Sequence, residues 1–92
     1  MKVRVKDDAL DVNDEPHPMR GLTGTVIERF GMTYAGFDCA VAFDCDHTEA
    51  AARLGTSAEN WAELVRLNPE LDHEGHPVFE DNLTENLEVV QP

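Results

Sequence analysis

The chain has 92 residues, which suffices for one domain and excludes two separate hydrophobic cores. Nineteen acidic residues oppose seven basic ones, and the net charge of −12 disfavours binding to nucleic-acid phosphates and to anionic membranes. A hydrophobic fraction of 41% is close to that of ordinary globular domains and argues against a disordered chain.

The first half of the chain predicts three strands. Residues 2–6 alternate between valine and a charged residue, which is typical of a half-buried strand. A long polar loop is expected over 7–20, which is rich in acidic residues and proline. A second strand is predicted from about 25 to 30, followed by a connection over 31–36. The third strand, 37–43, has a larger apolar residue at every second position.

A helical insert is predicted over about 46–76. Asp46 and Thr56 are each followed three residues later by a glutamate, and this capping-box spacing predicts that a helix begins at each position. Gly55 suits the end of the first helix, and Pro69 follows the end of the second.

The second predicted helix carries an apolar stripe of Trp61, Leu64 and Val65. This spacing favours packing of the insert against the rest of the domain. The alternative is an exposed face that binds a partner.

Two short strands are expected at the end of the chain, over 77–80 and 86–90, with a tight connection at 81–85. The chain is therefore predicted to be one mainly β domain covering residues 1–92. It would have five strands and a two-helix insertion between the third and fourth.

Five short strands with a long first loop are typical of a small SH3-like barrel. The spacing Gly21-x-x-Gly24-x-Val26 resembles that of KOW-type and related SH3-like barrels. With Pro18 and Arg20 ahead of it, the same stretch looks like the barrel domain of nitrile hydratase β subunits.

The C-terminal stretch VFEDNLTENLEVV resembles the closing strands of the ferredoxin–thioredoxin reductase variable chain, and the photosystem I subunit PsaE is similar in layout. The resemblance covers roughly residues 1–45 and 77–90. It implies a five-stranded SH3-like barrel of the electron-transport accessory type, without catalytic residues or a cofactor. The insert departs from this pattern, and its helical segment is similar to part of a LysM repeat whose flanking strands are lacking here.

Cys39, Cys45 and His47 are candidate metal ligands, and His73 or His76 could complete a site. The pattern favours the alternative of core cysteines and solvated histidines. A cysteine–histidine nucleophile pair is a further alternative, but no third orienting group stands at a recognisable spacing.

Two segments are candidates for partner binding. The first loop carries a cluster of acidic residues with no basic residue facing it in the sequence: Asp7, Asp8, Asp11, Asp14 and Glu15. It would steer a basic partner, or it is simply a solvated loop. Met32 and Tyr34 are candidate exposed contacts in the following connection.

Together these features predict a non-catalytic accessory or protein-binding module that stabilises or regulates a larger partner with a basic surface. One alternative is an acidic inhibitor that mimics nucleic acid, and another is a small metal-binding protein. Neither nucleic acid nor membrane is expected to bind directly. The absence of an apolar N-terminal region, of an apolar run of about 18 residues and of a CxxC pair predicts a cytoplasmic protein.

Overall fold

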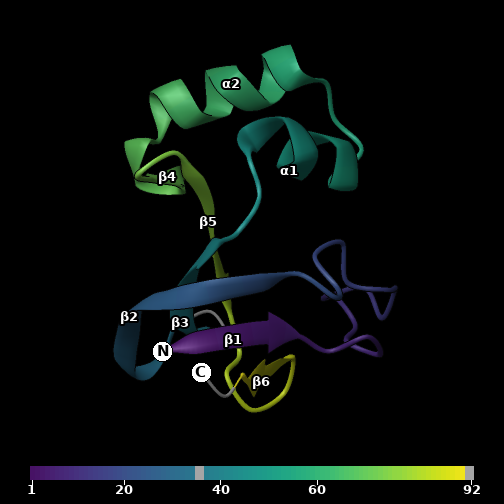
Figure 1. Cartoon of the computed structure of the whole chain (residues 1–92), viewed down its shortest axis with the longest axis vertical. Helices are drawn as coiled ribbons and strands as arrows, with labels where there is room; N and C mark the ends of the chain where they lie inside the picture. Colours follow the sequence, from purple (N-terminus) through teal and green to yellow (C-terminus); the bar gives the residue numbers. More distant parts are fainter. Residues whose placement is uncertain (35–36, 91–92) are drawn as a thin grey trace.

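The computed structural model describes residues 1–34 and 37–90, and of residues 31–34 it describes the backbone only (Figure 1). Its strands are β1 (Lys2–Val5), β2 (Thr23–Tyr34), β3 (Phe37–Phe43), β4 (Asp72–His73), β5 (His76–Asp81) and β6 (Leu87–Val89). Its helices are α1 (His47–Arg53), α2 (Ala58–Leu67) and the short 3₁₀ helix η1 (Pro69–Leu71).

The strands form one antiparallel sheet in the order β4–β5–β3–β2–β1–β6. The prediction of a mainly β chain with two helices after the third strand is confirmed. The sheet is not a closed barrel: over the described ranges, β6 pairs with β1 but with neither β4 nor β5. The two-residue strand β4, which lies within the predicted helical insert, adds a sixth strand.

β3 is covered on both faces, as its alternating pattern predicts. Cys39, Val41 and Phe43 are fully buried in the main core, whereas Ala40 and Ala42 belong to a small cluster on the opposite face. Successive residues of a strand point to opposite sides, which places the two alanines on the second face. Their small side chains leave room there for an aromatic neighbour.

β2 is longer than predicted, because it continues through the segment 31–34 that was expected to be a connection. Its pairing with β3 shifts register twice, which lets the strand bend over the core. Near its start, Gly24 lies so close to β3 that an added Cβ would be 2.7 Å from Cγ1 of Val41 and 2.8 Å from the carbonyl oxygen of Ala42. This close approach explains the glycine.

The first helix begins as predicted, because the Asp46 carboxylate accepts a hydrogen bond from the Glu49 amide at 2.8 Å. The second begins at Ser57 and not at the predicted Thr56: the Ser57 hydroxyl accepts from the Asn60 amide at 3.1 Å. The Thr56 amide instead donates to the carbonyl of Ala51, so Thr56 closes the end of α1.

The insert sits at one end of the sheet, with α1 between α2 and the strands (Figure 1). Trp61 of α2 is 4% exposed and stacks on Phe79 of β5 with 5.6 Å between ring centroids. The predicted packing is thus confirmed for Trp61 and wrong for Leu64, which is 47% exposed because α2 forms the outer layer. Within the described residues, no helix is long and apolar enough to cross a membrane.

Candidate functional site

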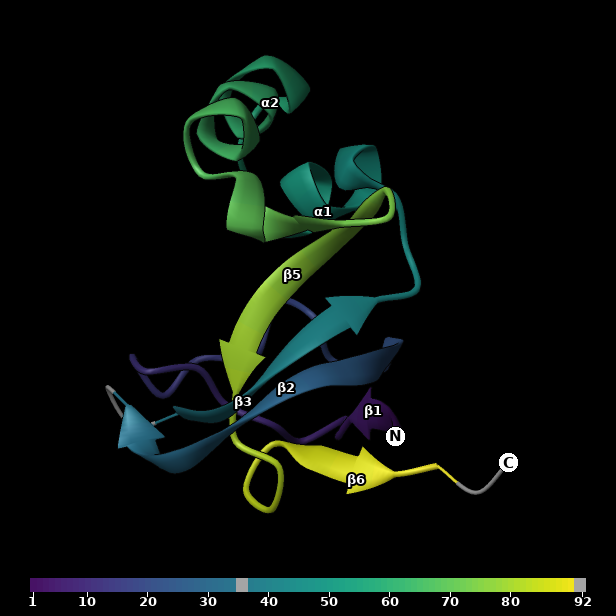
Figure 2. The ribbon, with the colours of Figure 1, turned by 90° about the vertical axis from the view of Figure 1, so that its left-hand side faces the viewer.

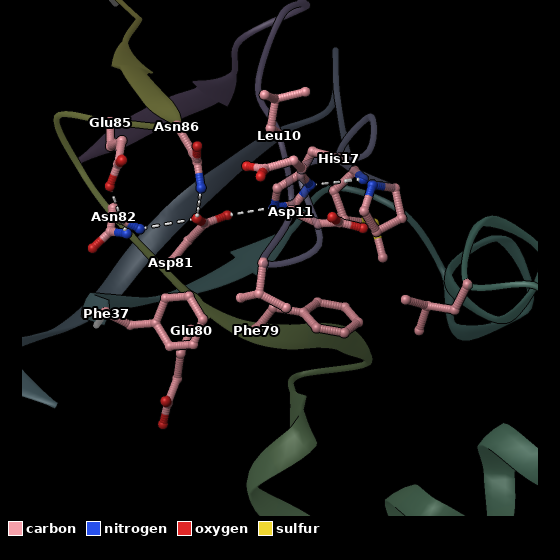
Figure 3. A pocket seen from close by; sticks show the side chains of 15 residues that line it. Leu10, Asp11, His17, Phe37, Phe79, Glu80, Asp81, Asn82, Glu85 and Asn86 are labelled. Atoms are coloured by element: carbon pink, nitrogen blue, oxygen red, sulfur yellow. Dashed lines mark hydrogen bonds and ion pairs between the residues drawn. The ribbon is translucent and has the colours of Figure 1, made fainter. Parts of the chain in front are cut away.

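A pocket of about 390 Å³, here called the loop-side pocket, opens between the first loop and β5 (Figure 3). Apolar side chains contribute to its lining: Leu10, Val12, Met19, Phe37, Leu54 and Phe79. Carboxylates also line it: Asp11, Asp14, Glu80, Asp81 and Glu85. An apolar lining with a few polar groups is typical of a binding site.

A buried histidine–aspartate pair joins the first loop to β5 in this pocket. Nε2 of His17 lies 2.9 Å from Oδ2 of Asp81, at ion-pair distance but without the alignment of a regular hydrogen bond. The other ring nitrogen, Nδ1, accepts a hydrogen bond from the Met19 amide at 3.0 Å. Nδ1 is therefore unprotonated, and the imidazole proton of a neutral His17 lies on Nε2, facing the carboxylate.

The other oxygen of Asp81 is held by the chain that follows β5. Oδ1 accepts hydrogen bonds from the Asn82 amide at 2.9 Å and from Nδ2 of Asn86 at 2.8 Å. Burial raises the pKa of Asp81, but the contact with His17 and the hydrogen bonds from Asn86 and Asn82 together outweigh it, so the pKa lies below its ordinary value. Asp81 is therefore a charged, buried anchor for the loop and for the turn before β6.

Cys39 lies beside this network but is not a reactive thiol. Its side chain is fully buried and donates to the carbonyl oxygen of Asp81 over 3.4 Å. Burial, together with the neighbouring charge of Asp38, raises its pKa to about 12. Only the thiolate is a strong nucleophile, so Cys39 is inert at neutral pH.

A second hollow, here called the sheet-side pocket, lies across β5 from the first. Its apolar lining includes residues of β2, β3 and β5: Ile27, Phe30, Ala40 and Val78. Its acidic lining is Glu28, Glu70, Asp72 and Glu80. Phe37, Phe79 and Glu80 line both pockets, so the two hollows meet along β5.

Neither pocket has a lysine or arginine among the described residues that line it. Much of the basic charge lies elsewhere and is already paired, in the ion pairs Lys2–Asp44, Arg4–Asp7, Arg4–Glu88, Arg53–Glu49 and Arg66–Glu63. The acidic excess of the chain is thus left unbalanced around the two pockets.

The residues of the predicted acidic cluster have different surroundings. Asp11 and Asp14 line the loop-side pocket, and Asp8 joins both in a smaller adjoining hollow. Glu15 is exposed. The expectation that no basic residue faces the cluster is wrong for Asp7, whose carboxylate accepts from Arg4 at 2.7 Å.

Asp11 also shapes the tip of the first loop. Its Oδ1 accepts hydrogen bonds from the amides of Asn13 and Glu15 at 2.8 and 3.0 Å. Asp14, at the tip, has a φ of 59°, a conformation that aspartate tolerates better than most residues.

The predicted contacts Met32 and Tyr34 lie in β2, but their side chains are outside the described part of the chain. The hypothesis that they bind a partner stays a prediction.

The candidate metal ligands are not brought together. Both nitrogens of His47 are in use: Nδ1 accepts from the indole N–H of Trp61 at 2.9 Å, and Nε2 lies 2.6 Å from Oδ1 of Asp72. Cys39 is buried in the sheet, and burial raises the pKa of Cys45. The described residues hold no group of three histidine, cysteine, aspartate or glutamate side chains placed to bind a metal ion.

The sequence analysis missed the network of His17, Asp81 and Asn86. One signal was present: Asp81 is two residues beyond Phe79 and so shares its strand face, which places a charge at an inward position. An inward charge indicates a buried partner, but the strand pattern does not say which residue of the first loop supplies it.

Comparison of the chain with models of known protein families, with curated proteins and with solved structures finds no match. The resemblance to SH3-like accessory barrels therefore stays a prediction. A proposal of function therefore depends on the geometry and charge of the two pockets.

Proposed function

We propose that this protein is a non-catalytic protein-binding module that docks a basic surface of a larger partner. One observation carries the proposal: two adjoining pockets combine an apolar lining with carboxylates and have no lysine or arginine among their described lining residues. Apolar contacts would supply affinity, and the carboxylates would select a positively charged partner.

The charge of the whole chain supports the same partner. At −12, the protein attracts cations over a distance and speeds their encounter at low salt. Aspartates 11 and 14 stand in the loop at the pocket wall, where they would act on an approaching basic side chain.

A non-catalytic role fits the chemistry of the loop-side pocket. Both nitrogens of His17 face groups of the protein itself, and Cys39 is a buried thiol. These side chains stabilise the fold, and neither is presented to a bound molecule as an acid, base or nucleophile.

The strand order supports an SH3-like arrangement as part of this proposal. β1 pairs with both β2 and β6, so the last strand returns to the first, as in SH3-like meanders. The accessory role of the resembled barrels would then extend to this chain, with the insert of α1 and α2 as its own addition.

Charge reversal tests the proposal. The double variant Asp14→Lys with Glu80→Lys changes the two pockets, and Glu59→Lys with Glu74→Lys makes the same change in charge at exposed positions outside them. Binding of a fluorescent octalysine peptide is measured by anisotropy at about 0.02 M and about 0.5 M salt.

We expect the pocket variant to weaken binding at low salt about tenfold and the control variant by less than about threefold. The difference should shrink at high salt, because exposed charges are then screened. Equal loss in both variants, or no binding of the peptide to the native protein at low salt, would rule the proposed site out.

A further inference from the structure

Beyond the hairpin that joins β5 to β4, the outer edge of β5 pairs with none of the described strands. Glu74 and Gly75 make the two-residue turn, with φ values of 52° and 88°, as the tight turn of a hairpin requires. The hairpin pairs His73 with His76 and Asp72 with Pro77, and β4 ends there. Figure 2 shows β5 continuing past this point beside β3.

The backbone of Glu80 faces this outer edge. Along an antiparallel strand, the N–H and C=O groups of successive residues point alternately to the two neighbours. His76 closes the hairpin and so points toward β4, which puts Val78 and Glu80 on the same side, away from β3. Within the described part of the chain, no backbone group pairs with Glu80 on that side.

The two pockets meet along this edge, where Phe79 and Glu80 line both of them. Asp81 points to the core face and lines only the loop-side pocket, whereas Val78 points to the other face and lines only the sheet-side pocket. Side chains of a strand laid along β5 would alternate between the same two faces. An extended segment would therefore place successive side chains in alternate pockets.

We propose that the partner segment is an extended, lysine- or arginine-containing peptide that adds to the sheet as a new strand along β5. This inference rests on the proposed function above and names its binding mode. The main chain of the segment would bond to Glu80, and its basic side chains would meet carboxylates of both pockets. A helical segment would leave the N–H and C=O groups of Glu80 unused.

Two substitutions at one residue separate backbone from charge. Glu80→Pro removes the outward N–H, which an edge strand tolerates, and Glu80→Gln removes the same charge while keeping the N–H. The probe is a fluorescent lysine–valine octapeptide in which pairs of lysines alternate with pairs of valines, so that an extended strand presents lysine on both faces, measured at low salt. A second probe has the same sequence with every peptide-bond nitrogen methylated, so that it keeps the lysine charges but has no main-chain N–H to donate to a strand edge.

We expect Glu80→Gln to weaken binding about threefold and Glu80→Pro to weaken it about tenfold further, because a backbone hydrogen bond is lost. The methylated peptide should bind the native protein at least about tenfold less tightly. This second comparison keeps the test valid if Glu80→Pro does not fold.

The outcomes distinguish the two proposals. If the plain and methylated peptides bind equally, strand addition is overturned, while docking of a basic partner stands. If neither lysine–valine nor octalysine peptide binds the native protein at low salt, the proposed function fails and this inference fails with it.

Discussion

Two histidine–aspartate pairs link the first loop to β5 and the first helix to β4, through the same ring nitrogens but with different alignment and surroundings. In each, Nδ1 accepts a hydrogen bond, from the Met19 amide for His17 and from the Trp61 indole for His47. In each, Nε2 faces an aspartate, at 2.9 Å for Asp81 and 2.6 Å for Asp72. The aspartate side chains differ in exposure, 1% for Asp81 and 40% for Asp72.

That difference decides what each pair contributes. Water can replace either member of the exposed pair, so its net effect on stability is small. A buried donor or acceptor that loses its partner has no such replacement and carries the full cost of its desolvation. The buried pair should therefore hold the first loop and the β5–β6 connection together as one cooperative unit.

The largest expected effect comes from removing the buried carboxylate. Asp81→Ala leaves His17, the Asn82 amide and Asn86 without their acceptor and should lower the free energy of unfolding by about 3 kcal/mol. Urea denaturation followed by tryptophan fluorescence measures this change. Asp72→Ala is the matched control and should shift the urea midpoint far less. Equal shifts would mean that the two pairs contribute equally to stability.

A double-mutant cycle gives the next largest effect. The coupling energy between His17 and Asp81, from the single and double alanine variants, should be about 1–2 kcal/mol, because each group is the buried partner of the other. The same cycle on His47 and Asp72 should give a smaller value. A coupling for the buried pair that is indistinguishable from zero would show that the 2.9 Å contact contributes nothing to stability.

The smallest effect is the dependence of stability on pH. The hydrogen bond from His47 lowers the pKa of Asp72, and the bonds to Asp81 lower its pKa despite burial. A carboxyl group whose pKa is lowered in the folded state stabilises the folded protein at pH values above its unfolded pKa of about 3.9. This contribution is lost as the pH falls through the pKa of the folded state. The native protein should therefore lose stability below about pH 4.

Neutral amides test the origin of that acid loss. Asp81→Asn should flatten the fall in the urea midpoint between pH 6 and pH 2, and Asp72→Asn should flatten it less. Parallel curves for native protein and Asp81→Asn would mean that other carboxylates, such as Asp44, govern acid unfolding.

Strands and helix starts could be read from the chain because they depend on near neighbours. The alternation in 37–43 and the capping of α1 by Asp46 are both found as expected. The start of α2 could not be read in the same way. Thr56 and Ser57 are equally able to cap a helix, and the choice depends on how α1 ends.

The sequence did not predict which distant segments contact each other. His17 and Asp81 meet because β5 passes the first loop, and neither residue carries a local pattern that specifies the other. The two pockets likewise arise from how loop, strands and helices meet, so Glu80 could be recognised as a shared wall only in the folded chain.

The sequence by itself determined an acidic, mainly β chain with two helices after the third strand, because charge, alternation and capping are properties of composition and short spacing. The tertiary structure alone decided that the sheet stays open, that α2 presents Leu64 to solvent, and which acidic residues gather around the edge of β5. These features follow from contacts between residues far apart in the chain. Each such contact closes a long loop, and whether it forms depends on the whole fold.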